Sequence, residues 1–144
     1  MRGFEVAKGY QNINLPRRST VESAGYDFEV CKDLVIEPGE IKLAETGVKA
    51  YMQSDEVLKL YPRSSLPRKY KVTIPNNVGI IDADYYSNKK NDGAIYVQLY
   101  NFSSETIIIK KGERIAQGIF SKYLTIENEV AVTTKRNGGF GSTD

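Results

Sequence analysis

The chain of 144 residues is long enough to form one domain with its own hydrophobic core, and 20 basic against 18 acidic residues leave a net charge of +2. This charge balance does not favour a nucleic-acid-binding surface, and no run approaches the roughly 18 apolar residues of a membrane span. The single cysteine, Cys31, favours a reducing, cytoplasmic setting. Because histidine is absent, Ser-His-Asp catalysis, Cys-His catalysis and His-based metal sites are excluded, and carboxylates are the natural general bases.

Short segments rich in β-branched and aromatic residues recur between turn signals, and no window of about 12 residues carries a helical apolar stripe. This pattern predicts an all-β domain, built as a sandwich, jelly roll or barrel. The expected strands are 25–30, 41–52 with a break at Gly47, 57–61, 78–81, 95–102, 106–110, 114–120 and 124–132.

Two polar segments are expected to lie outside these strands. Residues 88–93 end in Asp-Gly and are predicted to form an exposed hairpin tip. Residues 137–144 contain three glycines and no strand pattern, which predicts a mobile tail.

The stretch Val-Gly-Ile-Ile-Asp-Ala-Asp-Tyr at 78–85 is the first candidate site. If it is a strand, Asp82 and Asp84 point to the same face because they are two residues apart, and the ring of Tyr85 follows at once. Such a pair of carboxylates beside an aromatic ring can bind and activate a ligand. The alternative is a strand that runs into an Asx-type turn with solvated carboxylates.

Two further segments have the composition of anion-binding loops. Arg63, Ser64 and Ser65 lie between prolines and offer a guanidinium, hydroxyls and backbone amides to a phosphate. The alternative there is a surface loop with serines capping a short turn. Residues 135–143 combine a basic pair, glycines and Phe140, which could cover a flat ligand, although a disordered tail would have the same composition.

Two strand segments carry isolated polar residues. Alternation along 112–120 places Gln117 with Ile115 and Ile119 on one apolar face, where a buried side-chain amide needs hydrogen-bond partners. The alternative is a glutamine at an edge or interface whose amide is hydrogen bonded to backbone. Asp27 stands between two aromatic residues at 26–28, which is also compatible with an ordinary half-buried strand.

In chain order, the motifs AGYDF (24–28), PRSSL (62–66), VGIIDADY (78–85), GERIAQ (112–117) and GGFGST (138–143) resemble the five motifs of the homotrimeric dUTPase family. The resemblance implies a jelly-roll-like β domain at 1–134, a flexible arm at 135–144 that closes over the active site, and a homotrimer whose three sites are each assembled from all three subunits. It also implies hydrolysis of dUTP to dUMP and pyrophosphate, which keeps uracil out of DNA and supplies dUMP for thymidylate synthesis.

The same resemblance assigns roles to individual residues. Asp82 would activate the water that attacks the α-phosphorus, and Tyr85 would pack against the deoxyribose and exclude a 2′-hydroxyl. Asp27 would reach the Mg²⁺ ion of the bound triphosphate through its waters, so that no direct protein ligand is needed. The other implied substrate-binding residues are Arg63, Ser64, Ser65 and Gln117 at the phosphates, Asn76, Ile81 and Tyr96 at the uracil edge, Phe140 stacked on the uracil, and Arg136, Gly141, Ser142 and Thr143 at the γ-phosphate.

The chain departs from the family pattern in three places. Extra residues follow the third motif as far as Gly93, which affects the placement of Tyr96. Lys135 has the usual spacing to the phenylalanine of the fifth motif and Arg136 is one residue closer, so that either cation could meet the γ-phosphate. Asp144 stands where a glycine is common.

Two other functions are compatible with parts of this pattern. A dCTP deaminase-like enzyme shares the fold and the Arg-Ser-Ser stretch, but it would need a glutamate near the base, and the third motif contains none. A dUTPase-like trimer could also bind nucleotide mainly to control a regulatory protein partner.

Overall fold

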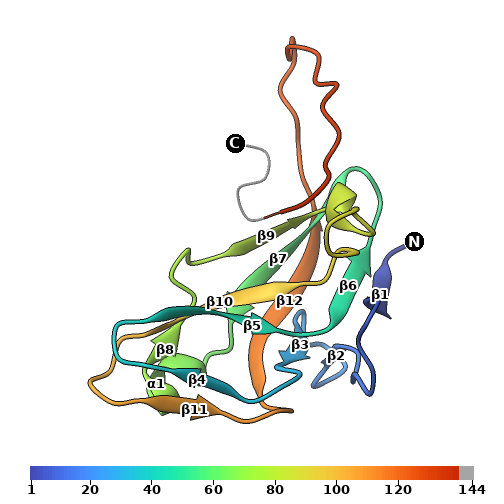
Figure 1. Cartoon of the computed structure of the whole chain (residues 1–144). Coiled ribbons are helices and arrows are strands. Elements are labelled where there is room, and N and C mark those ends of the chain that lie inside the picture. The colour runs from blue at the N-terminus through green and yellow to red at the C-terminus, as the bar shows by residue number, and fades with distance from the viewer. Residues whose placement is uncertain (140–144) are drawn as a thin grey trace.

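Antiparallel β-strands dominate the computed structural model, which describes residues 1–139 (Figure 1). These residues contain one α-helix, which is short. In chain order the elements are β1 (Gly3–Val6), β2 (Arg17–Arg18), β3 (Tyr26–Glu29), β4 (Leu34–Ile36), β5 (Ile41–Glu45), β6 (Val48–Tyr51), β7 (Glu56–Pro62), α1 (Leu66–Tyr70), β8 (Val72–Thr73), β9 (Gly79–Asp82), the 3₁₀ turn η1 (Ala83–Tyr85), β10 (Tyr96–Asn101), β11 (Ile107–Ile109) and β12 (Arg114–Lys122).

The largest sheet has the strand order β2-β3-β12-β7-β9, with β9 at one edge. The long strand β12 pairs with both β3 and β7, and β9 pairs with β7 so that Asp82 lies opposite Val57 and Gly79 opposite Leu60. Three smaller sheets have the orders β5-β10-β8, β1-β6 and β11-β4. Their inward side chains share one buried cluster with the large sheet, and the largest fully buried members are Phe28, Ile36, Leu58, Leu60, Ile95, Leu99, Ile109 and Ile115.

The predicted all-β class and seven of the eight predicted strands are confirmed within a few residues. The predicted break at Gly47 is also confirmed, because this glycine has a left-handed φ of 71° between β5 and β6. The short strands β1, β2, β4 and β8 and the helix α1 were not predicted from the sequence. A helix of five residues with Leu66 as its one buried member is too short to show a periodic apolar stripe.

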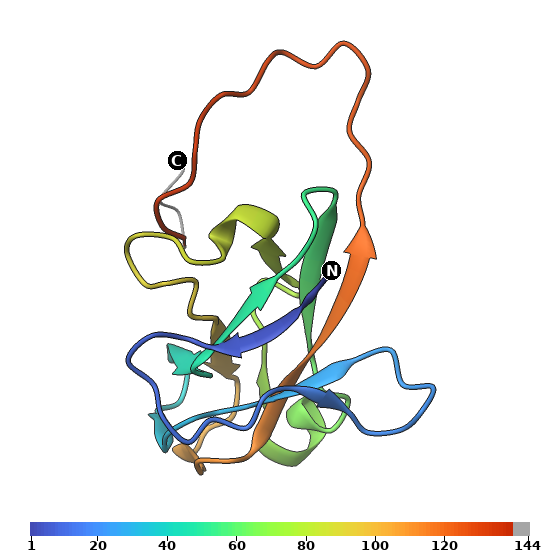
Figure 2. The same cartoon turned by 90° about the vertical axis from the view of Figure 1, so that its right-hand side faces the viewer.

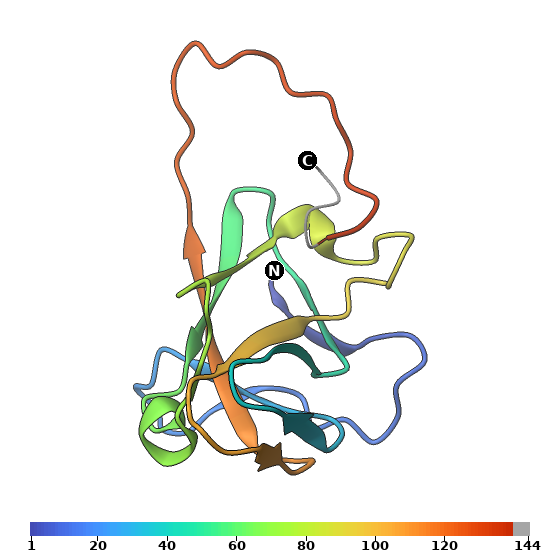
Figure 3. The ribbon, with the colours of Figure 1, turned by 60° about the vertical axis from the view of Figure 1, so that its left-hand side comes forward.

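The predicted strand at 124–132 is wrong. Leu124, Ile126, Val130 and Val132 do alternate with polar residues, but they are 96%, 75%, 85% and 75% exposed and make no ladder with another strand. Residues 123–139 instead leave the end of β12, arc away from the sheets and return to η1, as Figures 2 and 3 show from two sides. Alternation alone was insufficient because a strand also needs a partner for its backbone hydrogen bonds.

The prediction of an exposed hairpin tip at 88–93 is also wrong. Only Lys89 and Lys90 of these six residues are exposed, whereas Asn88 and Gly93 are buried. Polar side chains cause this burial, because they hydrogen bond to the backbone of the same loop and to neighbouring elements. Of the tail predicted at 137–144, residues 140–144 lie outside the described part of the chain.

No helix among residues 1–139 is long and apolar enough to cross a membrane.

Candidate active site

Strand β9 and the turn η1 together position the carboxylates and the ring of the third motif. Asp82 ends the edge strand with an extended backbone, and η1 then turns the chain so that Tyr85 points inward and is 5% exposed. The side chains of Asp82 and Asp84 remain 51% and 61% exposed. The two carboxylates do lie on a common side, although Asp84 belongs to the turn and not to a continued strand, because both contact the guanidinium of Arg136.

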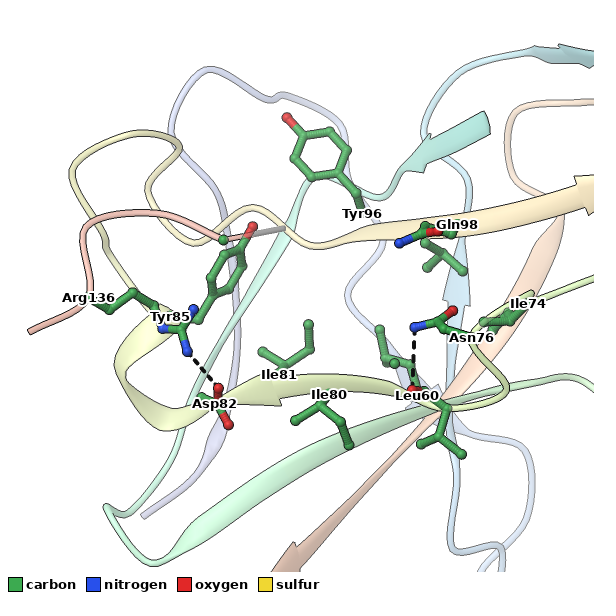
Figure 4. Close-up of a pocket in the computed structure, with 14 residues that line it drawn as sticks. Leu60, Ile74, Asn76, Ile80, Ile81, Asp82, Tyr85, Tyr96, Gln98 and Arg136 are labelled. Atoms are coloured by element: carbon green, nitrogen blue, oxygen red, sulfur yellow. Dashed lines mark hydrogen bonds and ion pairs between the residues drawn. The ribbon is translucent and has the colours of Figure 1, made fainter. Parts of the chain in front are cut away.

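A cavity of about 300 Å³ lies beside these residues, between β9 and β10 (Figure 4). Asp82, Tyr85 and Arg136 are at one end of it, and Asn76 and Gln98 are at the other (Figure 4). Ile81, Tyr96 and Val97 also line the cavity, so that a slot with apolar lining carries polar groups at both ends. This combination is typical of a pocket for a small, partly polar ligand.

Gln98 was not predicted as a site residue. The alternation along β10 contained the necessary signal, since Val97 and Leu99 are buried in the core while Tyr96 and Gln98 are half-buried on the opposite face.

The returning arm places Arg136 against the carboxylates of η1. Its Nη2 lies 2.6 Å from Asp82 Oδ2, its Nε lies 2.7 Å from Asp84 Oδ1, and its side chain is only 17% exposed. Lys135 is exposed, so in this chain it is Arg136 that reaches the cavity. Three residues further on, Gly139 lies close to the ring of Tyr85: a Cβ atom on this glycine would lie 2.5 Å from Cε1 of the ring.

The hydroxyl of Tyr85 faces away from the carboxylates and is held by the loop before β10. It donates to the backbone oxygen of Ala94 at 2.6 Å and accepts from Nδ2 of Asn91 at 2.8 Å. Burial raises the pKa of the Tyr85 hydroxyl, which keeps it protonated and able to donate at neutral pH. Asn91 was not predicted as a site residue, because its loop was expected to be exposed.

A second cluster of charged residues forms around Asp27 on β3. One of its oxygens lies 3.4 Å from Nε of Arg63, and the other lies 3.5 Å from Nη1 of Arg114 and accepts from the hydroxyl of Ser19 at 2.7 Å. Arg63, Ser65 and Arg114 also line a cavity of about 250 Å³ next to α1. An excess of guanidinium groups over carboxylates suits an anion that brings more than one negative charge.

Gln117 belongs to this second cluster, but the apolar face predicted for it is wrong. A bulge between Arg114 and Ala116 shifts the register of β12 against β3. The inward face beyond the bulge is therefore Ala116 and Gly118, and a Cβ atom on Gly118 would lie 2.8 Å from Phe28. Gln117 is half-buried on the other face, opposite Asp27, and its Nε2 donates to the backbone oxygen of Pro62 at 3.5 Å.

The serines between the prolines are placed differently from each other. Ser64 is exposed, whereas Ser65 is half-buried at the N-cap of α1 without a side-chain capping hydrogen bond. The hydroxyl of Ser65 is therefore available to a ligand in the cavity it lines with Arg63.

The two clusters lie at opposite ends of β7 and cannot meet within one chain. Asp82 is opposite Val57, and Arg63 comes six residues after Val57, immediately beyond the end of β7. At about 3.3 Å per strand residue, this separation is roughly 20 Å. Figure 1 shows the same arrangement, with α1 and the returning arm at opposite ends of the molecule.

The predicted site residues therefore fall into three groups. The residues gathered around the first cavity are Asn76, Ile81, Asp82, Tyr85, Tyr96 and Arg136. The residues at or beside the second cluster are Asp27, Arg63, Ser64, Ser65 and Gln117. The residues that lie outside the described part of the chain are Phe140, Gly141, Ser142 and Thr143.

Within residues 1–139, no three acidic or thiol side chains gather in a group that could hold a metal ion. Asp27 is a single carboxylate between two guanidinium groups. This donor set fits a Mg²⁺ ion that carries its own waters and phosphate oxygens better than an ion bound directly by the protein.

A β domain in which a carboxylate and an aromatic ring line one cavity, while arginines surround a second carboxylate, is typical of an enzyme acting on a small anionic ligand. A sequence model of dUTPases matches residues 11–144. The chain belongs to the dUTPase family, which confirms the resemblance found from the five motifs.

The similarity extends over nearly whole chains. A deoxyuridine 5′-triphosphate nucleotidohydrolase from Lactococcus lactis is 51% identical, with 99% of this chain and 97% of that protein aligned. One from Nautilia profundicola is 37% identical, with 97% of each aligned. The crystal structure of the dUTPase from Streptococcus mutans superimposes with a TM-score of 0.82 at 44% identity, covering 88% of this chain and 99% of that one. The expected dUTPase fold is thereby confirmed.

Proposed function

We propose that Asp82 is the general base with which this chain, a dUTP hydrolase, converts dUTP to dUMP and pyrophosphate. The observation that carries the proposal is the position of Asp82, a half-exposed carboxylate at the end of a slot lined by Tyr85, in a chain without histidine. The carboxylate takes a proton from a water molecule while the water oxygen bonds to the α-phosphorus. The bond from that phosphorus to the bridging oxygen breaks, and pyrophosphate leaves with the electron pair.

In this proposal the first cavity binds the nucleoside. Asn76, Tyr96 and the backbone at Ile81 read the edge of the uracil, and Tyr85 packs against the deoxyribose where a 2′-hydroxyl would clash. Phe140 stacks on the uracil. The apolar slot with polar groups at both ends supports this assignment, because a pyrimidine has flat apolar faces and a polar edge.

The second cluster binds the phosphates in the same proposal. Arg63, Ser64, Ser65 and Gln117 hold phosphate oxygens, and Asp27 would hold a Mg²⁺ ion through the waters of that ion. When bound, this ion neutralises part of the triphosphate charge. The arginine pair at Asp27 supports the assignment, since guanidinium groups match phosphate oxygens in geometry.

Because the two clusters are roughly 20 Å apart in one chain, a complete site needs residues from neighbouring chains. We therefore infer an oligomer with shared sites, and the resemblance to the family's motifs implies that it is a homotrimer. Exposed aliphatic side chains support burial against other subunits; Ile41, Leu43, Ile80 and Ile108 are between 47% and 54% exposed.

The arm changes partner during the reaction in this account. Arg136 holds Asp82 and Asp84 in the structure, so that Oδ2 of Asp82 is engaged in an ion pair and is not free to accept from a water. A bound triphosphate offers Arg136 a partner with more negative charge, so that the guanidinium moves to the γ-phosphate, with the amides of Gly141, Ser142 and Thr143, and Asp82 is released.

Release of pyrophosphate from dUTP, measured on the purified protein beside UTP and dCTP, tests the proposal. We expect turnover of dUTP in preference to the other two nucleotides. Release of ammonia from dCTP would instead support the deaminase-like alternative, and no reaction with dUTP would refute the proposal.

A further inference from the structure

The loop at 87–93, between η1 and β10, holds the ring of Tyr85 in the first cavity. Its contact residue is Asn91, whose Nδ2 donates to the Tyr85 hydroxyl at 2.8 Å. The same hydroxyl donates to the backbone oxygen of Ala94 at 2.6 Å. The phenol oxygen is therefore fixed by one donor and one acceptor, and the ring has little freedom to swing.

Asn88 determines which end of the Asn91 amide faces the tyrosine. Its Nδ2 donates to Oδ1 of Asn91 at 2.7 Å, and the backbone N–H of Gly93 donates to the same oxygen at 3.1 Å. Two donors on Oδ1 leave Nδ2 as the atom that points to the Tyr85 hydroxyl. Asn88 Nδ2 also donates to the backbone oxygen of Tyr85 at 2.8 Å. Tyr85 is therefore held at both its backbone and its hydroxyl.

The loop is itself attached to another part of the fold. Asp92 Oδ2 accepts from Nζ of Lys49 on β6 at 2.9 Å and from the backbone N–H of Lys8 at 2.9 Å. Lys49 also donates to the hydroxyl of Ser87 at 3.1 Å, and its side chain is only 13% exposed. Because Asp92 is bonded from two separate segments, the loop cannot shift as a flexible hairpin tip would.

The backbone of the loop demands glycine at one position. Gly93 has a left-handed φ of 85°, and a Cβ atom there would lie 2.8 Å from the backbone nitrogen of Ser87 and 2.9 Å from the backbone oxygen of Tyr85. Both clashing atoms belong to backbone that cannot move aside. The compact form of the loop therefore depends on this residue.

We propose that the loop at 87–93 is a positioning element for sugar selection, with Asn91 as the residue that positions Tyr85 and with the Lys49–Asp92 pair as its anchor. The inference rests on the proposed function, in which the Tyr85 ring excludes a 2′-hydroxyl. A ring held at its hydroxyl discriminates against the extra oxygen by contact. A ring released at that end can tilt and admit it.

The test compares kcat/KM for dUTP and UTP in Asn91→Ala and in the parent. We expect the ratio of the two values to narrow about fivefold, the effect typical of losing one neutral hydrogen bond. Tyr85→Phe removes the same bond from the other side and is expected to narrow the ratio at least as much. The double variant is expected to equal Tyr85→Phe alone, because the bond that Asn91→Ala removes is already absent when the hydroxyl is gone.

Lys90→Ala is the matched control in the same loop. The Lys90 side chain is exposed, and its backbone N–H, which donates to Asn88, remains in the variant. Its ratio is expected to stay within twofold of the parent. An equal change in Lys90→Ala and Asn91→Ala would overturn the proposal, because it would mean that any change in the loop has this effect.

Two further measurements separate failure of the inference from failure of the proposed function. Tyr85→Ala is expected to narrow the ratio of kcat/KM for dUTP and UTP more than Asn91→Ala does. If Tyr85→Ala narrows this ratio while Asn91→Ala leaves it equal to the parent's, the positioning role of Asn91 is overturned and the role of Tyr85 stands. If Tyr85→Ala leaves the ratio intact, the proposed sugar contact is wrong and the inference falls with it. Calorimetric affinities for dUMP and UMP measure discrimination between the two sugars without turnover. Additive losses in the variant that combines Asn91→Ala with Tyr85→Phe would also overturn the coupling of these two residues.

Discussion

Gly139→Ala tests whether the arm closes on Tyr85. A Cβ atom at this position would lie 2.5 Å from Cε1, 3.2 Å from Cδ1 and 3.4 Å from Cζ of the Tyr85 ring. The ring cannot give way easily, because it is 5% exposed and its hydroxyl is bonded on two sides. The arm must therefore lift by about the overlap that the methyl group creates.

The size of the effect follows from that overlap. An added methylene in a tight contact typically costs about 1–3 kcal/mol, and the exposed arm can relax toward the lower figure. A cost of about 1 kcal/mol corresponds to a roughly fivefold weaker closing equilibrium. We therefore expect KM for dUTP to rise about 5- to 10-fold in Gly139→Ala, with an unchanged Tm, because the arm belongs to no sheet and can lift without disturbing one.

Steady-state pyrophosphate release at varied dUTP concentration measures this effect. Asn137→Ala is the control, since Asn137 belongs to the same exposed segment and its side chain does not line the cavity. A KM for Gly139→Ala that matches the Asn137→Ala value would refute the reasoning, because the arm would then close without the contact to Tyr85.

The remaining predictions concern charge. The hydrogen bond from Lys49 lowers the pKa of Asp92, so the pair stabilises the folded protein above the unfolded-state pKa of this carboxyl and is lost as pH falls through the lowered value. Asp92→Asn is expected to cost about 1.5 kcal/mol in urea unfolding at pH 7 and clearly less at about pH 3, where the carboxyl is partly protonated, and an equal cost at both would contradict the pairing. Chelation of Mg²⁺ is expected to raise KM for dUTP at least about tenfold in the parent, because the Asp27 carboxylate then repels a triphosphate whose charge no ion neutralises. The rise is expected to be smaller in Asp27→Asn, which lacks this negative charge. An equal response of the two proteins in the same assay would argue against the placement of Mg²⁺ beside Asp27.

Much of the fold follows from local patterns in the sequence. The strands β5, β6, β7 and β10 carry alternating or continuous apolar residues bounded by turn residues, and these signals are local. The missed strands β2 and β8 have two residues each and exist only because a longer strand lies next to them. The segment 124–132 shows the converse, since it has the alternation but pairs with no strand among residues 1–139.

The geometry of the first cavity was predictable where one motif supplies its residues and not where contacts distant in sequence do. Asp82 and Tyr85 could be placed side by side because β9 and η1 are contiguous. The face of Gln117 was mispredicted because a bulge is a property of the pairing with β3 and leaves no mark in an alternating sequence. The role of Asn91 depends on the fixed geometry of its loop, which is set in part by Lys49, 43 residues before Asp92.

Complementation between two inactive variants tests the central claim most directly, namely that Asp82 of one subunit acts with Arg63 of another. Asp82→Asn removes the base, and Arg63→Ala removes a phosphate contact roughly 20 Å away in the same chain. When the two variants are unfolded, mixed in equal amounts and refolded together, random assembly of a symmetric trimer gives about a quarter of sites with both residues intact. We predict that dUTP hydrolysis returns to about a quarter of the parental rate. A mixture that stays as inactive as its components, or a parent protein that is fully active as a monomer, would contradict the shared site.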